Sequence, residues 1–444
     1  MTFLPAIAAA LGSPGPGVDV SFVGDGAFAS AFAVTDLAAA SIAAVGAEVA
    51  ALAGARAVVV DRRLASWWFL LSIRPQGWDL PPVWDPIAGD YPTADGWIRL
   101  HTNAPHHRAA ALGVLGCDGE RSAVAASVAR WRADELEAAV VDARGCAAAM
   151  RDLGAWRTHE QGVAVADEPL VAWSAGAATG SSFAPTPGRP LTGVRVLDLT
   201  RVLAGPVATR FLAGYGADVL RLDPPWWDEP SVVPEVTAGK RCARADLATT
   251  EGRATFERLL AEADVLVHGY RADALERLGL GAARRQEIRP GLIDVSLDAY
   301  GFTGPWRHRR GFDSLVQMSS GIAAEGMRRA GRDRPTPLPA QALDHATGYL
   351  LAAAAVRGLR TRRDDGRGSI ARCSLARTAR LLVDGPPGRF DEALAPVADA
   401  DYATDVEHTT WGPAHRLRAP LEIDGVPWRW DRPANALGSS PPVW

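Results

Sequence analysis

An alternation of apolar runs and helical segments between residues 190 and 300 is the feature that most limits the possible folds of this chain. Two runs rich in β-branched residues, 191–200 and 218–223, flank a turn and a helix that ends near Gly214. A strand, a helix and a second strand within about thirty residues form a βαβ unit, whose strands are parallel. Further helices and strands are expected at 250–263, 264–268, 272–278 and 292–297. The sequence therefore predicts an α/β fold with a Rossmann-like parallel sheet, flanking helices and a ligand at the carboxyl ends of the strands.

The turn after the first strand lacks the glycine pattern of dinucleotide-binding proteins. Residues 201–206 read Arg-Val-Leu-Ala-Gly-Pro, with no Gly-x-Gly-x-x-Gly. That pattern lets the backbone approach a pyrophosphate at the start of the following helix. NAD is therefore disfavoured as the ligand.

Length and composition describe a folded chain without a strong bias in charge. A chain of 444 residues suits two or more domains, and a net charge of −4 gives no electrostatic reason to expect nucleic acid or an anionic membrane as a partner. The first residues lack the basic segment of a signal peptide, and no stretch is expected to be long and uncharged enough to span a bilayer. The four cysteines have neither zinc-site nor disulfide-type spacing, so we expect no metal and a cytoplasmic location. They are Cys117, Cys146, Cys242 and Cys373.

The rest of the chain predicts four parts around the sheet. Residues 1–82 have the pattern of a helix, a strand and a second helix, and 83–173 form a small α+β domain with a hairpin turn at Asp95-Gly96. Residues 174–189, rich in Gly, Ser, Ala and Pro, are expected to be a linker. The sheet domain covers 190–380, and 381–444 hold a loop and a closing strand.

Residues 1–82 also share a pattern with the end of the sheet domain. An Ala-rich helix follows Asp36 and leads to an apolar strand at 58–61, as another follows Asp344 and leads to 369–376. An internal repeat, with 1–82 as a degenerate half-copy of the large domain, would explain the similarity. The other explanation is that any two Ala-rich helices look alike.

Blocks of sequence within the sheet domain resemble the family III CoA-transferases, which include formyl-CoA and carnitine CoA-transferases and α-methylacyl-CoA racemase. The blocks occur in the family's order at 191–206, 216–223, 239–241, 263–271, 274–280, 301–306, 311–317 and 343–348. The resemblance implies transfer of coenzyme A from an acyl-CoA to a carboxylic acid, by a homodimer that binds neither nucleic acid nor membrane. In the family the small domain follows the catalytic helix, whereas here it comes first, so the domain order looks fused or permuted.

The last of these blocks contains Asp344, which the resemblance identifies as the nucleophile. A carboxylate can hold the acyl group as a mixed anhydride and then accept CoA as a thioester. On the residues alone, an aspartate at the start of a helix is more often a simple cap, and the helix dipole favours its ionised form. Asp36 occupies the matching place in the possible repeat and is expected to be a relic or a cap.

A racemase of this family would use a histidine in a Gly-His-Asp block to move an α-proton. Here Phe312 takes the place of that histidine. His345 is adjacent to Asp344, but adjacent helical residues point about 100° apart and make a poor pair of bases. Racemisation is therefore disfavoured. An isomerase on the same fold remains an alternative, as does an inactive CoA-binding subunit, since no glycine-rich loop like that of some members is evident.

The resemblance also places residues for coenzyme A at the strand ends and the turns that follow them. Arginine suits bidentate binding of phosphate, and Lys240 is the only lysine in a chain that otherwise uses arginine. Most arginines in such a chain are simply solvated, so each alone is a weak signal. The expected coenzyme A contacts are Arg201, Val202, Leu203, Arg221, Lys240, His268, Tyr270 and Arg277.

Overall fold

The computed structural model describes residues 2–12, 17–180 and 183–444. Its largest element is a seven-stranded sheet in the order β10-β9-β8-β11-β12-β13-β7, in which β7 at one edge is antiparallel and the other strands are parallel. These strands are β7 (Ala172–Ala178), β8 (Arg195–Leu199), β9 (Asp218–Asp223), β10 (Lys240–Arg244), β11 (Val265–His268), β12 (Ile293–Asp298) and β13 (Arg367–Ser374). The predicted α/β fold with a parallel sheet is confirmed.

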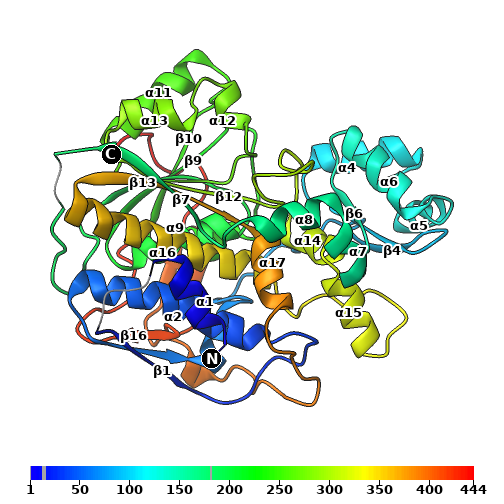
Figure 1. Cartoon of the computed structure of the whole chain (residues 1–444), viewed down its shortest axis with the longest axis horizontal. Helices are drawn as coiled ribbons and strands as arrows, with labels where there is room; N and C mark the ends of the chain where they lie inside the picture. The colour runs from blue at the N-terminus through cyan, green and yellow to red at the C-terminus, as the bar shows by residue number, and fades with distance from the viewer. Residues whose placement is uncertain (1, 13–16, 181–182) are drawn as a thin grey trace.

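Helices cover both faces of this sheet, which explains why its strands are continuous apolar runs. They are α9 (Ala204–Gly214), α10 (Val233–Val236), α11 (Thr250–Glu262), α12 (Ala274–Arg277), α13 (Ala282–Ile288) and α16 (Ala342–Asp365). Leu197 and Leu266 face α11, where they pack in one cluster with Phe256. Their neighbours Val196 and Val265 face the opposite way, into a second cluster that contains α9 and α16. In Figure 1, α11, α12 and α13 lie on one side of the sheet and α9 and α16 on the other.

Residues 83–149 form a separate α+β unit with its own apolar core. Its elements are β4 (Gly89–Pro92), β5 (Trp97–Leu100), β6 (Ala147–Ala149), α4 (Pro105–Leu115), α5 (Arg121–Val128) and α6 (Ala133–Asp142). The helices that follow, α7 (Leu153–Thr158) and α8 (Glu160–Asp167), instead place Trp156 and Val165 in the core of the sheet domain. β4, β5 and β6 make an antiparallel sheet, and Asp95-Gly96 lies in the turn between β4 and β5. Helices α4, α5 and α6 project to one side of the large sheet (Figure 1). We call this unit the small domain.

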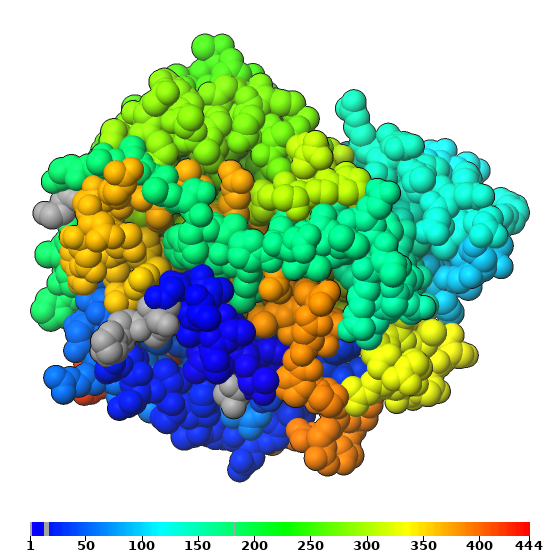
Figure 2. All heavy atoms as spheres, in the orientation of Figure 1, coloured from blue at the N-terminus to red at the C-terminus, as the bar shows by residue number. Residues whose placement is uncertain are grey.

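The N-terminal segment builds a second, smaller α/β layer. It contains α1 (Phe3–Ala10), β1 (Asp19–Val23), α2 (Val34–Ala53), β2 (Ala57–Asp61), α3 (Arg62–Trp68) and β3 (Ile73–Pro75). β1 and β2 are parallel, and β16 (Leu421–Ile423), from the other end of the chain, pairs with the free edge of β2. Helix α2 packs against α16, and the space-filling view shows the blue N-terminal residues directly against the gold and orange residues that end the sheet domain (Figure 2). The N-terminal segment therefore shares its core with the sheet domain.

The remaining elements connect these units. They are α14 (Asp313–Ser319), α15 (Ile322–Arg329), α17 (Leu375–Val383), the 3-10 turn Asp399–Asp401, β14 (Glu407–Thr409) and β15 (Gly412–Arg416). β15 pairs with both β14 and β3, so the C-terminal segment is attached to the N-terminal one by two sheets. α14 packs against β5 and β6 and thereby joins the small domain to the sheet domain.

Helices α2 and α16 begin and end in the same way. The residues before their first turns, Ala33 and Gln341, have φ and ψ of −76° and 64° and of −76° and 63°. Asp36 and Asp344 are each the third residue of their helix, and each helix ends at a left-handed glycine. A strand and a short helix follow in both cases, and each strand pairs with a parallel partner.

Two expectations from the sequence need correction. Residues 174–178, placed in a linker, belong to β7, because the outer edge of β13 pairs with this Ala-rich segment. Helix α2 is by length and composition apolar enough to cross a membrane, contrary to the expectation that no stretch would be. Most of it is buried inside the protein, as in the core helix of a folded domain.

Candidate functional site

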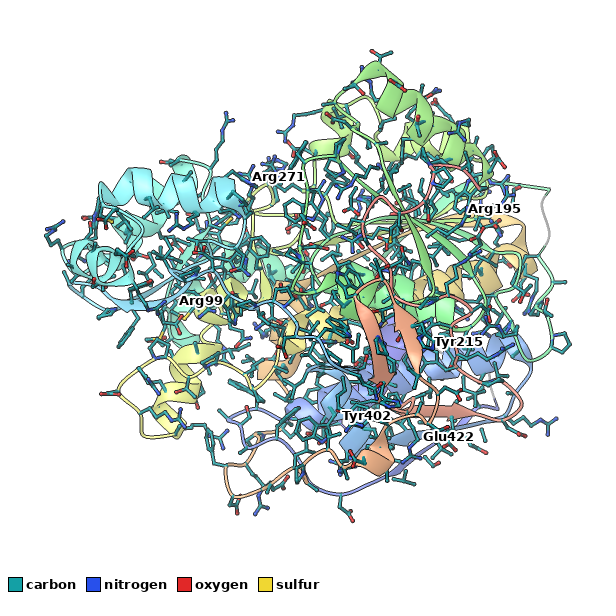
Figure 3. All side chains as sticks on the ribbon, turned by 180° about the vertical axis from the view of Figure 1, so that it is seen from behind. Arg99, Arg195, Tyr215, Arg271, Tyr402 and Glu422 are labelled. Carbon is teal, nitrogen blue, oxygen red and sulfur yellow. The ribbon has the colours of Figure 1, made fainter. Side chains whose placement is uncertain are left out.

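A cavity of about 420 Å³ opens between the carboxyl ends of the sheet strands and the small domain. Leu199, Tyr270 and Asp298 come to it from the ends of β8, β11 and β12 or the loops that follow, while His106 and His107 come from α4 of the small domain. Figure 3 shows the labelled Arg271 at this junction, between the cyan small domain and the green strands. The cavity is thus where open parallel sheets bind their ligands.

Asp344 forms part of the cavity wall and is 7% exposed. Within residues 2–12, 17–180 and 183–444, no hydrogen bond to its carboxylate oxygens is found, so Asp344 does not act as a cap of α16. Its backbone N–H donates to Oδ2 of Asp313, the first residue of α14, at 2.9 Å. Two carboxyl groups are therefore neighbours at this wall.

The environment raises the pKa of both carboxyl groups. Burial raises the pKa of Asp313 to about 6, although its carboxylate accepts hydrogen bonds from the Gln317 side chain and from backbone N–H groups. Burial, followed by the charge of Asp313, raises the pKa of Asp344 well above its ordinary value. The expectation that the helix dipole would keep Asp344 ionised is therefore wrong, because burial outweighs it. Of the pair, Asp313 has the hydrogen bonds that stabilise a charge, and Asp344 holds the proton more tightly.

The cavity carries an excess of positive charge. Arg201, Arg271 and Arg310 line it, and within the described residues none of them forms an ion pair with a carboxylate. Burial raises the pKa of Asp298 to about 8, so this carboxyl keeps its proton near neutral pH. Burial and neighbouring arginines lower the pKa of Arg271, as expected for cations without acidic partners. Such a cavity suits an anionic ligand.

The structure brings three of the predicted coenzyme A contacts to the cavity with Asp344. Arg201 and Val202 line it from the turn after β8, and Tyr270 lines it from the loop after β11. The Tyr270 hydroxyl accepts a hydrogen bond from Arg201 Nη2 at 3.4 Å. Leu203, by contrast, packs against the apolar core.

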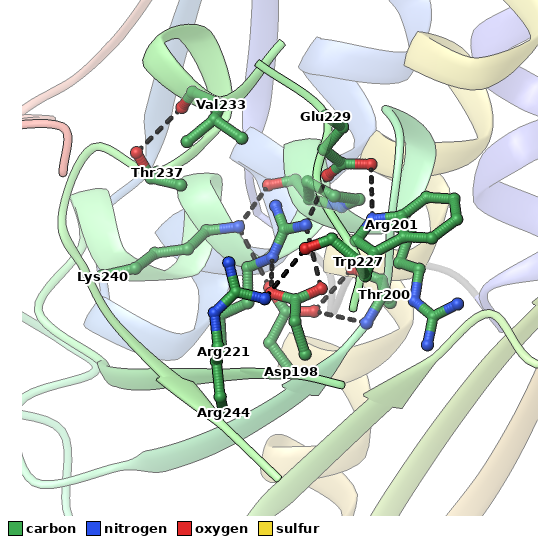
Figure 4. A network of polar contacts seen from close by, with 12 residues as sticks. Asp198, Thr200, Arg201, Arg221, Trp227, Glu229, Val233, Thr237, Lys240 and Arg244 are labelled. Atoms are coloured by element: carbon green, nitrogen blue, oxygen red, sulfur yellow. Dashed lines mark hydrogen bonds and ion pairs between the residues drawn. The ribbon is translucent and has the colours of Figure 1, made fainter. Parts of the chain in front are cut away.

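Arg221 and Lys240 do not reach the cavity, which corrects their predicted role as phosphate contacts. Both side chains are fully buried in the network that Figure 4 shows. Arg221 is paired with Asp223 at 2.8 Å and with Glu229. Lys240 Nζ lies 3.0 Å from Asp198 Oδ2 and donates to the Pro206 carbonyl oxygen at 3.0 Å. Sequence periodicity places these side chains on a strand but gives no sign of the acidic partners that neutralise them.

His268 and Arg277 also lie outside the cavity. His268 Nε2 is 3.3 Å from Asp294 Oδ1, and the ring belongs to a second cavity of about 270 Å³ on the other side of Tyr270. The Arg277 side chain is more than half exposed and pairs with Asp273 Oδ2 at 2.6 Å. Neither is placed as the sequence predicted.

The buried network instead fixes the turn that carries Arg201. Val202 has a left-handed backbone with φ of 64°, which is strained for a β-branched residue. Its N–H donates to Glu229 Oε2 at 2.9 Å, and Trp227 Nε1 donates to the same oxygen at 3.1 Å. Since Arg221 holds the other oxygen of Glu229, this arginine acts on the cavity indirectly, as a positioning residue.

Comparison with known proteins bears on these residues directly. Residues 191–389, which include the turn at Arg201 and the carboxyl pair Asp313 and Asp344, match the model of CoA-transferase family III. This part of the chain is similar to that family. The resemblance found in the sequence is thereby confirmed.

Several proteins that this chain resembles are named as CoA-transferases. It is 35% identical over 249 residues to succinyl-CoA:glutarate CoA-transferase of Mus musculus, covering 53% of this chain and 54% of that protein. It is 32% identical over 204 residues to succinyl-CoA–D-citramalate CoA-transferase of Chloroflexus aurantiacus, covering 41% and 48%. A crystal structure from M. tuberculosis matches 44% of this chain and 56% of its own, at 31% identity and a TM-score of 0.40. The chain spans about half the length of the curated relatives it matches.

Sequence reasoning missed several residues of this cavity. Asp313 and Arg271 lie in sequence blocks that resemble the family. The sequence analysis therefore included both residues but assigned no role to either. Residues of the small domain gave no signal, because nothing local indicates that α4 meets the sheet. The missed residues that line the cavity or adjoin Asp344 are His106, His107, Trp226, Trp227, Arg271, Arg309, Arg310, Phe312 and Asp313.

Among the described residues, no group of three or more His, Cys, Asp or Glu side chains is placed to hold a metal ion. Three of the cysteines are buried, and burial raises the pKa of the Cys146, Cys242 and Cys373 thiols to about 12. Cys117 is partly buried, and all four are free thiols. None of the four lines the cavity.

Proposed function

We propose that this chain transfers coenzyme A from an acyl-CoA to a carboxylic acid, with Asp344 as the nucleophile. The observation that carries the proposal is the Asp344 carboxyl group at the wall of a cavity in which, within the described residues, Arg201, Arg271 and Arg310 form no ion pair with a carboxylate. The positive charge would attract an anionic acceptor and the phosphates of coenzyme A. The names of the relatives point to the same reaction class.

The proposed reaction keeps the acyl groups and coenzyme A on one side chain. The Asp344 carboxylate attacks the thioester carbonyl of the donor, the C–S bond breaks, and an aspartyl anhydride and CoA thiolate form. The thiolate attacks the aspartyl carbonyl, which releases the donor acid and leaves an aspartyl-CoA thioester. The acceptor carboxylate then attacks this thioester to give a second anhydride and the thiolate. Attack of the thiolate on the acceptor carbonyl yields the new acyl-CoA and restores the Asp344 carboxylate.

Covalent trapping tests the identity of the nucleophile. Hydroxylamine or borohydride added during turnover should modify Asp344, and peptide mass mapping should find the adduct in the peptide that contains this residue. Asp36 is the matched control, because its carboxylate is paired with Arg62 at 2.7 Å and is absent from the cavity lining. An adduct on Asp36 would contradict the proposal.

The histidines near Asp344 favour transfer over a racemase-like proton shift, which would pair a histidine with an aspartate. Burial lowers the pKa of His107 to about 3, and burial together with nearby arginines lowers the pKa of His106. His345 is buried outside the cavity lining with a pKa lowered to about 3, and its ring stacks on Phe69. Bases this weak are poorly matched to an α-proton at neutral pH. An acyl-CoA supplied without an acceptor acid should therefore remain unchanged.

The pH dependence of the reaction should reflect the ionisation of Asp344 beside Asp313. Only ionised Asp344 is a nucleophile, and its pKa is raised, so kcat/KM should rise with pH along an acid limb above the ordinary range of a carboxyl group. The Asp313→Asn variant removes the neighbouring charge and lowers the pKa of Asp344, so the limb should move to lower pH. A pH–rate profile measures this shift. An Asp36→Asn variant should leave the limb in place, and an unmoved limb in Asp313→Asn would show that the two carboxyl groups are not coupled.

We also propose that residues 1–82 are a degenerate copy of the large domain in a fused or permuted chain. The matching starts and ends of α2 and α16 and the strands that follow them support this origin. In the copy, Arg62 neutralises Asp36, the counterpart of Asp344. The copy would then supply packing for the catalytic helix and no second catalytic site.

A further inference from the structure

A row of three polar side chains crosses neighbouring strands of the large sheet, outside the cavity that holds Asp344. His268, Ser296 and Arg372 are register partners on β11, β12 and β13, so their side chains point to the same face of the sheet. The residues before them point the other way, into the core that contains α16: Val267, Val295 and Ala371. All three polar side chains line the second cavity, of about 270 Å³. The face of the sheet that is apolar under α11 thus becomes polar where it meets this cavity.

Two of these side chains have polar atoms without partners. His268 is 7% exposed, and its Nε2 lies 3.3 Å from both Asp294 Oδ1 and Arg285 Nη2, whereas its Nδ1 has no partner among the described residues. Ser296 is also buried, and its hydroxyl makes no hydrogen bond to any described group. Asp294 pairs with Arg285 at 2.8 Å, so these two charges neutralise each other. Buried polar atoms without partners cost free energy, and a polar ligand in the cavity would satisfy them.

The cavity also has more positive than negative charge without a partner. Arg307 and Arg372 line it, and neither forms an ion pair within residues 2–12, 17–180 and 183–444. Asp273 lies in the same lining but pairs with Arg277 at 2.6 Å. Glu276 is then the one lining carboxylate that no arginine in the described part of the chain neutralises. Two guanidinium groups against one carboxylate leave an excess of positive charge, which favours an anionic ligand.

We propose that the second cavity binds a small oxyanion, such as inorganic phosphate or a short carboxylate. Its oxygen atoms accept hydrogen bonds from the guanidinium groups of Arg307 and Arg372 and from the Ser296 hydroxyl. Burial lowers the pKa of His268, and the neutral ring, with its proton on Nδ1, donates one more hydrogen bond while Nε2 accepts from Arg285. The cavity is smaller than the pockets of about 300–1,000 Å³ that hold drug-sized ligands, so it suits a ligand of a few atoms. Nothing in this site requires coenzyme A, so the inference is independent of the proposed function.

Calorimetry of the full chain with inorganic phosphate and with acetate tests this site. Arg372→Ala should weaken binding of the anion by about tenfold or more, because it removes a charge-assisted contact. Glu276→Gln removes a negative charge from the lining and should tighten binding by about two- to fivefold. Arg367→Ala is the matched control, because this exposed arginine lies at the other end of β13 and lines neither cavity. Thermal unfolding curves show whether each variant is folded.

Weaker binding in a folded Arg372→Ala protein supports the assignment, and the anion that binds, phosphate or acetate, identifies the preferred oxyanion. The assignment is wrong if neither anion binds the unmodified protein, or if folded Arg372→Ala binds it equally well. Binding that survives Arg372→Ala and is lost in Arg310→Ala would place the anion in the first cavity and likewise overturn the assignment. If Arg372→Ala fails to fold, the affinity of Glu276→Gln decides, since a residue that only supports the fold would not tighten binding when it loses its charge.

Discussion

Replacing Asp344 with asparagine is expected to reduce CoA transfer to background while the fold survives. An amide is not a nucleophile at neutral pH, so neither the anhydride nor the thioester can form, and a loss of activity on the order of 10⁴-fold or more is expected for a removed nucleophile. The fold should persist because asparagine has nearly the same shape as aspartate, and within the described residues no hydrogen bond to the Asp344 carboxylate oxygens would be lost. Chromatographic detection of the new acyl-CoA and a thermal unfolding curve measure the two properties.

The control for this experiment is Asp36→Asn. Asp36 has the same place in its helix but pairs with Arg62 and is absent from the cavity lining, so this variant should keep nearly all activity. Full turnover by Asp344→Asn, or loss of turnover in Asp36→Asn with an intact fold, would refute the mechanism. Loss of activity with an unfolded Asp344→Asn protein would instead be resolved by the trapping experiment on the unmodified chain.

Replacing Glu235 with alanine is expected to destabilise the whole molecule. Its buried carboxylate pairs with Arg210 and with Arg416 Nη1 at 3.1 Å, and it accepts hydrogen bonds from the Ser72 hydroxyl at 2.7 Å and backbone N–H at 3.1 Å. Removing it leaves the buried Arg210 guanidinium without an acidic partner and Arg416 with Glu407 alone, which costs about 3–5 kcal/mol. Because these partners come from the N-terminal segment, the sheet domain and the C-terminal strands, urea unfolding should show one transition shifted to lower denaturant.

The pH dependence of the stability lost in Glu235→Ala gives a further test of this role of Glu235. Burial opposes the charge, yet Arg210 and Arg416 hold the pKa of Glu235 below its ordinary value. The stabilisation is therefore present above the unfolded-state pKa and is lost as the pH falls through the folded-state pKa, so the variant and the unmodified protein should converge in acid. Asp391→Asn, in an exposed pair with Arg389, should leave stability unchanged at every pH. A Glu235→Ala protein as stable as the original at neutral pH would contradict this account.

Apolar patterning was enough to predict the sheet, whereas Asp344 was identified only through the family resemblance. β8, β9, β11 and β12 are short apolar runs between helices, and both faces of the sheet are covered, so the pattern and the structure agree. β7 escaped prediction because its Ala and Gly residues lack the branched side chains typical of strands, and its place depends on the edge of β13. Whether such a segment forms a strand depends on pairing partners that are distant in the sequence.

The charged residues also show that local sequence does not identify contacts with residues distant in the chain. Arg221 and Lys240 were expected to bind phosphate because they lie near strand ends, but Glu229 and Asp198 neutralise them in the interior. Conversely, Arg310 and Trp226 line the cavity through loops whose course no local pattern fixes. The role of an arginine therefore depends on its contact partners in the folded structure, which the local sequence does not identify.

The pairing of β16 with β2 constrains the order of events during synthesis. Until Leu421–Ile423 leave the ribosome, the N-terminal sheet consists of β1 and β2 alone, with one edge of β2 unpaired. A two-stranded ribbon is only marginally stable, and an open edge readily pairs with other chains. The sheet of β1 and β2 is therefore made well before the strand that completes it, and a nascent chain should depend on chaperones that shield strand edges.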